Sequence, residues 1–417
     1  MLRLRAVARY KPCLSAPSPL RVRSHLLPCK SSGSLPFTQH YQRLRLVSSL
    51  LHTSCVRSNP RPSEPTLDLE QDSTRRTPNA IRNAVLFAGF VAFDVYLWAA
   101  TRTNSDTGGW VKRIARQRGS AEGIENSAIT RARKFEFKEK LERWTLRVVR
   151  TVGGLPQILR VAIGEGTINI ANRILQAPDA LKVCWGICAI NGAVYLAWKV
   201  PRLSRFMLRN FQHHPLSGRS RTLLTSVFSH SSFMHLFFNC FALNGFGYAA
   251  GYYLTTQQNT GPSELLESTS ALHFLAFFVS AGLFASLASH IVSVKAYDSV
   301  VRALAKSAPR PRLRASLGAS GAIYSCVTLT ALAYPDLHIN ILFVPVDIPI
   351  QYGVGGLMLL DMIGFIRGWR LFDHIAHLGG ALFGAWYYMY GPRLWDAWRA
   401  ASANVFGGKP KAQQRIH

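Results

Sequence analysis

A serine and a histidine are the residues whose types and positions predict chemistry in this chain. Ser320 lies in a Gly-Ala-Ser-Gly run at 318–321, where a charged loop meets an apolar segment, and His377 lies inside another apolar segment. A polar side chain at membrane depth costs free energy unless it is paired, so such a histidine is a functional hypothesis by default. A neutral histidine within reach of a serine can take its hydroxyl proton and make it a nucleophile. The two residues do this chemistry only if their helices bring them together.

Composition places the chain among polytopic membrane proteins. Of its 417 residues 48% are hydrophobic, and these gather in blocks close to the 20 residues that cross a bilayer as a helix. We therefore expect an all-α polytopic membrane protein. Because 181–199 and 350–367 are the weakest of the blocks, six spans is the alternative to seven. The predicted spans are 83–101, 181–199, 231–254, 271–294, 318–334, 350–367 and 372–391.

The N-terminal segment has the composition of a mitochondrial transit peptide. From Met1 to Ser63 there are eleven Lys or Arg, and the first acidic residue is Glu64. An Arg-rich leader without acids is typical of mitochondrial import. We assign residues 1–56 to the transit peptide and expect a multi-pass protein of the mitochondrial inner membrane. A disordered basic tail on a protein of another membrane is the alternative.

The remaining chain divides by composition into five regions. The segment after the first span contains an amphipathic stretch at 129–152, which predicts a helix at the membrane interface or one packed on a partner or on the core's loops. The regions are a flexible linker (57–82), a lone N-terminal transmembrane helix (83–101), a polar linker with the amphipathic helix (102–179), a six-helix core (180–391) and a basic C-terminal tail (392–417).

The net charge of +28 is explained by membrane topology, and no nucleic-acid partner is expected. Eleven of the basic residues lie within residues 1–63, and most others flank apolar spans. Basic loops at 199–221, 295–314 and 367–370 alternate with loops that carry acids, so they share one face, predicted to be the matrix face. The long basic segment 102–180 breaks this pattern. The seven cysteines have no metal-ligand spacing, and we predict no cofactor.

This topology brings three polar residues to one depth. Spans three, five and seven all start at the basic face, and His235, Ser320 and His377 lie within their first turns, since a helix rises about 1.5 Å per residue. Small residues favour close approach of these helices. By itself, the Gly-Ala-Ser-Gly run also suits a simple helix-packing patch. The supporting small residues are Gly318, Gly321, Gly380 and Gly384.

A second polar pair predicts stabilisation of a transition state. His235 and Asn239 are four residues apart and so share one helical face. Peptide hydrolysis passes through an oxyanion, and hydrogen-bond donors aimed at it lower the barrier. These side chains and the Ser320 backbone N–H are our candidates. A satisfied structural histidine and an interhelical amide are the alternative interpretation.

Three separated motifs carry a resemblance to a known family. They are Phe228-Ser229-His230 through His235-Leu236-Phe237-Phe238-Asn239, then Gly318-Ala319-Ser320-Gly321, then Ala376-His377-Leu378-Gly379-Gly380-Ala381-Leu382-Phe383-Gly384. In type, order and helix placement they resemble the signature motifs of rhomboid intramembrane serine proteases, over residues 180–391. With the leader and the additional span, the chain resembles the mitochondrial subgroup.

The resemblance implies a six-helix rhomboid core with one additional N-terminal helix. It implies a Ser320–His377 dyad without a third acid, an oxyanion site from His235, Asn239 and the Ser320 amide, and Tyr324 packing near the histidine. The implied partners are the lipid bilayer and single-span membrane proteins, including a dynamin-like fusion GTPase and a cytochrome c peroxidase precursor or their equivalents. The Trp-Arg pair frequent in secretory-pathway rhomboids is absent from 199–229, so bilayer contacts of that loop do not transfer.

Two other functions stay open at this point. One is a catalytically inactive rhomboid-like protein that binds membrane clients. The other is a metal-dependent membrane enzyme, because His374 and His377 are three residues apart and His230 and His235 lie on another span. Metal sites of this kind usually recruit carboxylates or further histidines, and Asp373 is the only adjacent acid.

Overall fold

The apolar blocks of the sequence form helices, the structure in which a segment satisfies its own backbone in lipid. The computed structural model describes residues 5–6, 79–260, 265–304, 311–340, 347–369 and 372–406. The predicted transit peptide, apart from 5–6, lies outside these residues. In chain order the elements are β1 (Arg5–Ala6), α3 (Ala80–Arg118), α4 (Asn126–Thr151), α5 (Gln157–Gln176), α6 (Asp179–Ala197), α7 (Ser204–Asn210), α8 (Thr222–Thr225), α9 (Phe233–Ala242), α10 (Tyr248–Thr260), α11 (Ala271–Ala303), α12 (Ser320–Ala333), β2 (Leu337–Asn340), β3 (Asp347–Pro349), α13 (Ile350–Ile366) and α14 (His374–Phe406).

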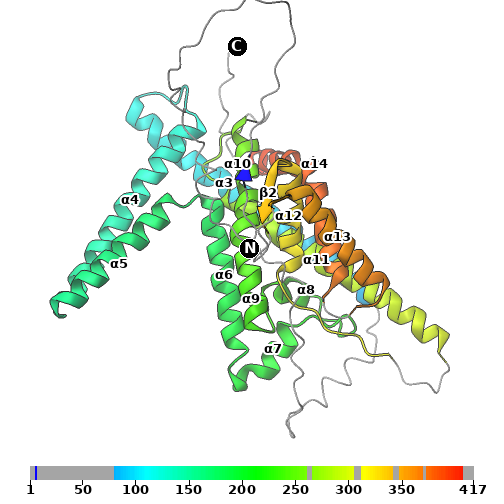
Figure 1. Ribbon diagram of the computed structural model, residues 1–417. Coiled ribbons are helices and arrows are strands. Elements are labelled where there is room, and N and C mark those ends of the chain that lie inside the picture. The colour runs from blue at the N-terminus through cyan, green and yellow to red at the C-terminus, as the bar shows by residue number, and fades with distance from the viewer. Residues whose placement is uncertain are drawn as a thin grey trace, which may run out of the picture.

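Helix α12 is the centre of the bundle (Figure 1). Every residue from Gly321 to Ala331 is buried, and the helix packs against α9, α10, α11, α13 and α14. Small side chains make up much of α12, so its neighbours approach closely on every side. Ser320, its first residue, therefore lies where several helices meet.

The closest helix contact is between α12 and α14. A Cβ added at Gly380 would collide with the backbone of Gly321, and one added at Gly384 would collide with the backbone of Ser325. The Ser325 hydroxyl donates to the Gly380 carbonyl at 2.6 Å. The stripe of small residues predicted on the last span thus meets α12 backbone to backbone.

The third predicted span, 231–254, forms a helix with a change of winding in the middle. Helix α9 passes into α10 through a π-helical segment, Leu243–Gly247. Such segments commonly mark functional regions in helices. The Asn244 amide in this segment donates to the Cys240 carbonyl at 2.8 Å. The π segment leaves α9 as a separate ten-residue element that carries His235 and Asn239.

Helix α3 is longer than the predicted span 83–101, and it is not isolated from the bundle. It packs along α11 and α14, burying small residues such as Ala99 and Ala100. Beyond residue 101 its polar side chains bond to the bundle: Asn104 donates to the Arg399 carbonyl at 2.8 Å. The apolar stretch ends at residue 101, but the helix continues because hydrogen bonds to the bundle satisfy its polar side chains.

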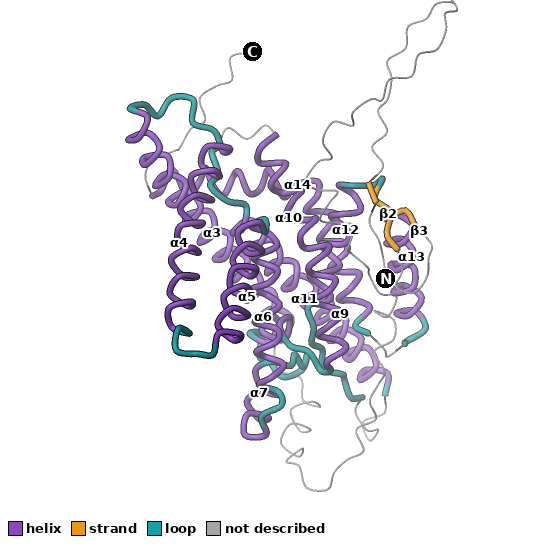
Figure 2. Tube along the Cα trace, turned by 60° about the vertical axis from the view of Figure 1, so that its left-hand side comes forward, coloured by secondary structure: helices purple, strands orange, loops and turns teal. Residues whose placement is uncertain are grey.

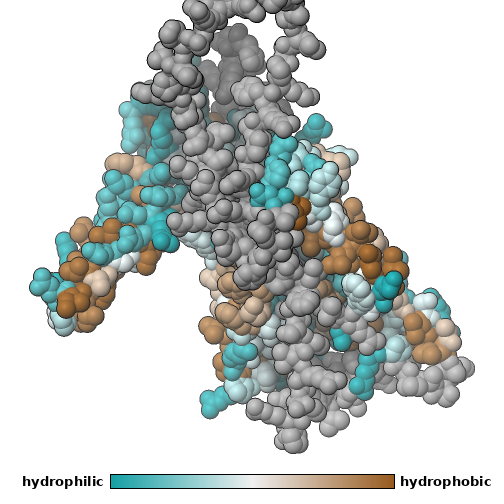
Figure 3. Space-filling view, viewed as in Figure 1, coloured by the Kyte–Doolittle hydropathy of each residue, from teal (hydrophilic) through white to brown (hydrophobic). Residues whose placement is uncertain are grey.

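Helices α4 and α5 form an antiparallel pair that projects from the side of the bundle (Figures 1 and 2). Helix α4 covers the amphipathic stretch predicted at 129–152 and buries only Ala128 and Ile129. Its exposed face carries ion pairs, including Arg113 with Glu136 at 2.6 Å. Hydrophobic side chains gather near the far end of the pair (Figure 3). Whether they contact lipid or a partner stays a prediction.

Three of the described helices are long and apolar enough to cross a membrane: α3, α6 and α11. The apolar helices α12 and α13 are shorter, at 14 and 17 residues. Helix α14 continues past the predicted end at residue 391, through Pro392 to Phe406. Every predicted span corresponds to helix, while the complete arrangement of one plus six spans stays a prediction. Strands β2 and β3 pair antiparallel beside the start of α13 (Figure 2).

Candidate active site

Ser320 and His377 are in direct contact. Ser320 is the first residue of α12, and His377 lies one turn into α14. The distance from Ser320 Oγ to His377 Nε2 is 2.8 Å. His377 is 5% exposed, while Ser320 is partly open. A buried imidazole thus contacts the hydroxyl of a partly exposed serine.

An acid lies on the other side of the histidine ring. The distances from His377 Nδ1 to the two carboxylate oxygens of Asp361 are 3.2 and 3.3 Å. Asp361 comes from α13 and is 4% exposed. A carboxylate only accepts, so Nδ1 carries the proton and Nε2 presents its lone pair to Ser320. The expectation of a dyad without a third acid does not describe this geometry, because α13 packs on α14 at the level of His377.

Asp361 is held by further donors. Tyr324 donates its hydroxyl to Asp361 at 2.6 Å, and His374 Nδ1 lies 2.6 Å from the same carboxylate. The Tyr324 ring also stacks on His377, with centroids 4.4 Å apart and planes 10° from parallel. Helices α12, α13 and α14 therefore all contribute to the orientation of one imidazole.

The His235 ring lies beside Gly318, in the loop that leads to Ser320. Gly318 has φ +130°, which side chains with a Cβ rarely adopt, and a Cβ there would lie 2.8 Å from the His235 ring. The imidazole therefore approaches the serine loop only because residue 318 is glycine. Ser232 caps α9 by accepting from the His235 N–H at 3.2 Å, and His230 packs edge-on against His235 at 5.0 Å.

Backbone hydrogen bonds hold the loop before Ser320. His213 and Ser316 form an antiparallel bridge, and the Gly318 N–H donates to the Ser226 carbonyl at 2.9 Å. On the histidine side, Asp373 accepts from the Ala376 N–H at 3.0 Å and from the Ser289 hydroxyl. Both ends of the Ser320–His377 contact are thus fixed by residues outside it.

Comparisons with known proteins cover the part of the chain that holds this site. Residues 217–393 match the family model for the Rhomboid domain, and this range includes Ser320, His377, His235 and Asp361. This part of the chain is a rhomboid domain. Presenilin-associated rhomboid-like protein A, mitochondrial, of Danio rerio is 33% identical over 226 residues, covering 53% of this chain and 50% of the relative.

Two further relatives are also mitochondrial rhomboid proteins that match about half of this chain. Presenilin-associated rhomboid-like protein, mitochondrial, of Mus musculus is 33% identical over 52% of this chain and 50% of the relative. Rhomboid protein 1, mitochondrial, of Saccharomyces cerevisiae is 27% identical over 49% of this chain and 52% of the relative. The chain thus spans about half the length of the curated relatives it matches. The chain is a multi-pass mitochondrial membrane protein that contains a rhomboid domain.

Asn239, the remaining predicted donor, is buried in the rhomboid domain one turn beyond His235. Its amide nitrogen donates to the His235 carbonyl at 2.8 Å, and its side-chain oxygen has no hydrogen-bond partner among the described residues. The structure therefore does not bring Asn239 into hydrogen-bond contact with Ser320 within the described chain. One amide hydrogen stays available, because a primary amide has two.

Sequence reasoning missed Asp361 and the contact that His374 makes with it. A signal for Asp361 was present, because it is the only acidic residue in the predicted span 350–367, and an ionisable residue within a span is a functional hypothesis. Among the described residues, no group of three or more His, Cys, Asp or Glu is arranged to hold a metal ion. His374 and His377, two of the four histidines considered for a metal site, both contact Asp361.

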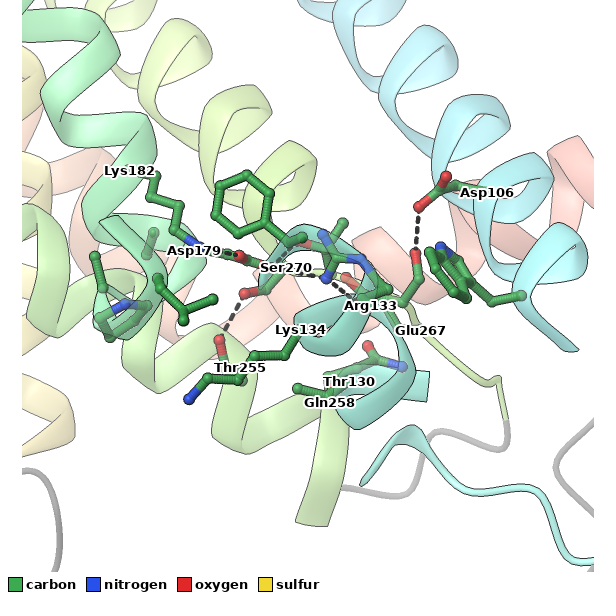
Figure 4. Close-up of a pocket in the computed structure, with 18 of the residues that line it drawn as sticks. Asp106, Thr130, Arg133, Lys134, Asp179, Lys182, Thr255, Gln258, Glu267 and Ser270 are labelled. Atoms are coloured by element: carbon green, nitrogen blue, oxygen red, sulfur yellow. Dashed lines mark hydrogen bonds and ion pairs between the residues drawn. The ribbon is translucent and has the colours of Figure 1, made fainter. Parts of the chain in front are cut away.

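A cavity of about 730 Å³ lies away from Ser320, at the start of α11 (Figure 4). It is lined by α3, α4, α6, α10 and the segment before α11. Arg133 of α4 crosses it to Asp179 at 2.9 Å and to the Ser268 carbonyl at 2.5 Å. Lys182 also pairs with Asp179, at 3.5 Å. The two Arg133 contacts fasten α4 to α6 and to the segment before α11.

Proposed function

We propose that this rhomboid is an intramembrane serine endopeptidase of the mitochondrial inner membrane, with Ser320 as nucleophile and His377 as general base. The observation that carries the proposal is the 2.8 Å contact between Ser320 Oγ and His377 Nε2, with Asp361 on the opposite ring nitrogen. Nucleophile, base and an orienting group in this order are the arrangement that activates a hydroxyl.

The reaction follows from that order. Ser320 Oγ attacks the carbonyl carbon of the scissile peptide while His377 Nε2 takes the hydroxyl proton. The tetrahedral intermediate then releases the amine, which receives that proton from His377. A water molecule then attacks the acyl carbon as its proton passes to the same nitrogen. The bond from that carbon to Ser320 Oγ breaks, and His377 returns the proton to Oγ, which restores the serine.

Asp361 contributes by stabilising the imidazolium that forms in each half of the reaction. Its negative charge lies beside Nδ1, and its other partners, Tyr324 and His374, keep the carboxylate in place. The site therefore acts as a triad in place of the dyad that the family resemblance implied.

The oxyanion is stabilised by donors near Ser320. The first N–H groups of a helix have no partner inside that helix, and the helix dipole favours negative charge there. Ser320 is at this position in α12. His235, beside Gly318, and the second amide hydrogen of Asn239 complete the proposed site.

The substrates are single-span membrane proteins that enter from the bilayer. A site built at the ends of membrane helices suits a transmembrane segment that unwinds locally to expose a peptide bond. Following the resemblance, a dynamin-like fusion GTPase and a cytochrome c peroxidase precursor, or their equivalents, are the proposed substrates.

The test uses purified full chain in liposomes with a fluorogenic single-span substrate. Wild type is expected to cleave it, and Ser320→Ala and His377→Ala are expected to lower kcat by at least about a thousandfold. Ser299→Ala is the matched control, because it makes the same chemical change at an exposed serine of α11, and it retains wild-type cleavage. Equal cleavage by Ser320→Ala and wild type would refute the assignment.

A client-binding function is separated from proteolysis by covalent labelling. An activated serine reacts with a fluorophosphonate probe, whereas binding alone needs no activated hydroxyl. Labelling that depends on both Ser320 and His377 supports an active enzyme. A chain that binds single-span proteins but is never labelled is a client binder.

A further inference from the structure

Asp361 makes its shorter histidine contact with His374, not with the proposed base. The distance from His374 Nδ1 to Asp361 Oδ1 is 2.6 Å, against 3.2 Å from His377 Nδ1 to the same oxygen. The two histidines are three residues apart on α14 and so lie on one face. A single carboxylate oxygen is therefore shared by two imidazoles of one helix turn.

The surroundings of His374 are tight and give its ring little contact with water. The ring is 5% exposed, and its Nε2 has no hydrogen-bond partner among the described residues. It packs over Gly364 of α13, where an added Cβ would lie 2.5 Å from ring atoms. A buried imidazole with one hydrogen bond contributes through that bond or through its packing.

The direction of the bond follows from the chemistry of its partners. Because the carboxylate only accepts, His374 donates its Nδ1 proton. This donor, with Tyr324 from α12 at 2.6 Å, leaves Asp361 no freedom to rotate away from His377. Without His374, Oδ1 would be held only by the longer contact to the base.

We propose that His374 is a positioning residue for the reaction, acting through Asp361. It never contacts the substrate. Its bond fixes the carboxylate so that Asp361 meets His377 Nδ1 throughout the catalytic cycle. The inference rests on the proposed protease function and concerns the same site.

The test compares two substitutions of nearly the same shape. His374→Asn keeps an N–H close to the position of Nδ1, and His374→Leu has the same branching without a donor. His374→Leu removes a hydrogen bond to a charged carboxylate, and such bonds are stronger than those between neutral groups. We therefore expect His374→Leu to lower kcat tenfold to a hundredfold. KM should change by less than twofold, and His374→Asn should recover most of kcat.

A double-mutant cycle tests the route through Asp361. In an Asp361→Asn background, His374→Leu is expected to cause no further loss of kcat, because the carboxylate it holds is gone. The rate of fluorophosphonate labelling of Ser320 should follow kcat in all four proteins. If the leucine variant does not fold, His374→Ala takes its place in the cycle.

Several results would overturn the inference. Wild-type kcat for His374→Leu, equal losses for Asn and Leu, or a loss that persists undiminished with Asp361→Asn each contradict a positioning role. These outcomes are distinct from failure of the proposed function. If Ser320→Ala abolishes cleavage and His374→Leu leaves it intact, only the role of His374 is rejected.

Discussion

At the scale of single residues, the two ring nitrogens of His377 contact two different partners. Nε2 contacts Ser320 at 2.8 Å, and Nδ1 faces Asp361. A histidine between two hydroxyls would have no preferred tautomer. The Asp361 carboxylate favours the tautomer that carries its proton on Nδ1. Nε2 is then unprotonated, as a general base for the Ser320 hydroxyl must be.

Asp361→Asn is therefore expected to be severely impaired. The amide nitrogen can donate to Nδ1, which favours the tautomer with its proton on Nε2, and kcat should fall about a thousandfold. KM should change little, because Asp361 is buried and contacts Tyr324, His374 and His377.

Steady-state kinetics on the single-span substrate measures this effect. Asp336→Asn makes the same chemical change at an exposed position and serves as the control. Equal kcat for Asp361→Asn and wild type would show that Asp361 is a structural ligand of Tyr324 and His374 only.

At the scale of elements, the contact between α12 and α14 sets the distance between Ser320 and His377. Both residues lie at the starts of these helices, and Gly380 lies one turn beyond His377 against the Gly321 backbone. Any side chain larger than hydrogen at 380 must push the helices apart. The glycine thus acts on the Ser320–His377 contact through the separation of the two helices.

Gly380→Ala is expected to destabilise the fold and lower activity together. Overpacking costs about 1–3 kcal/mol, and a small outward shift of α14 weakens the Ser320–His377 contact. Gly355→Ala is the matched control, since a Cβ at 355 on α13 meets nothing within 4 Å. Thermal unfolding in detergent and the cleavage rate measure both effects. An unchanged melting temperature for Gly380→Ala contradicts this account of the contact.

The starts of the helices were predicted closely where hydropathy controls them. The span expected at 350–367 is α13 at Ile350–Ile366, and that expected at 318–334 is α12 at Ser320–Ala333. Helix ends were missed where polar residues are satisfied by neighbours, as in α3 and α14. The π segment in the third span was also missed, because no local pattern distinguishes it from α-helix.

At the scale of the whole molecule, α3 is joined to the rhomboid domain by a buried polar network. Glu267, in the connection between α10 and α11, pairs with Arg399 at 3.4 Å and accepts from Trp395 at 3.1 Å. Arg399 in turn donates to Asn104 of α3 at 3.0 Å. The first helix is therefore part of the folded core.

This network predicts a pH-dependent stability. Burial raises the pKa of Glu267 to about 7, despite the opposing attraction of Arg399. The folded chain then binds more protons than the unfolded chain between about pH 4.5 and 7, so stability falls as pH rises through this window. The expected loss is on the order of 3 kcal/mol, complete above about pH 7.

Thermal unfolding of wild type and Glu267→Gln from pH 5 to 8 isolates this group, because the other titrating groups are common to both proteins. The melting temperature of wild type should fall relative to that of the glutamine variant up to about pH 7. A difference that stays constant over the whole range would show that Glu267 does not titrate there.

By itself the sequence determined the membrane class, the helical blocks and the motifs around Ser320, His377 and His235, because hydropathy and short motifs are local properties. Only the tertiary structure decided which acid meets the histidine. Asp361 is 16 residues from His377 in the chain, and nothing in its own segment shows which face of α13 turns toward α14. The same reason applies to His374, whose spacing to His377 also suited a metal site. The packing of three helices around one carboxylate brings both histidines to Asp361.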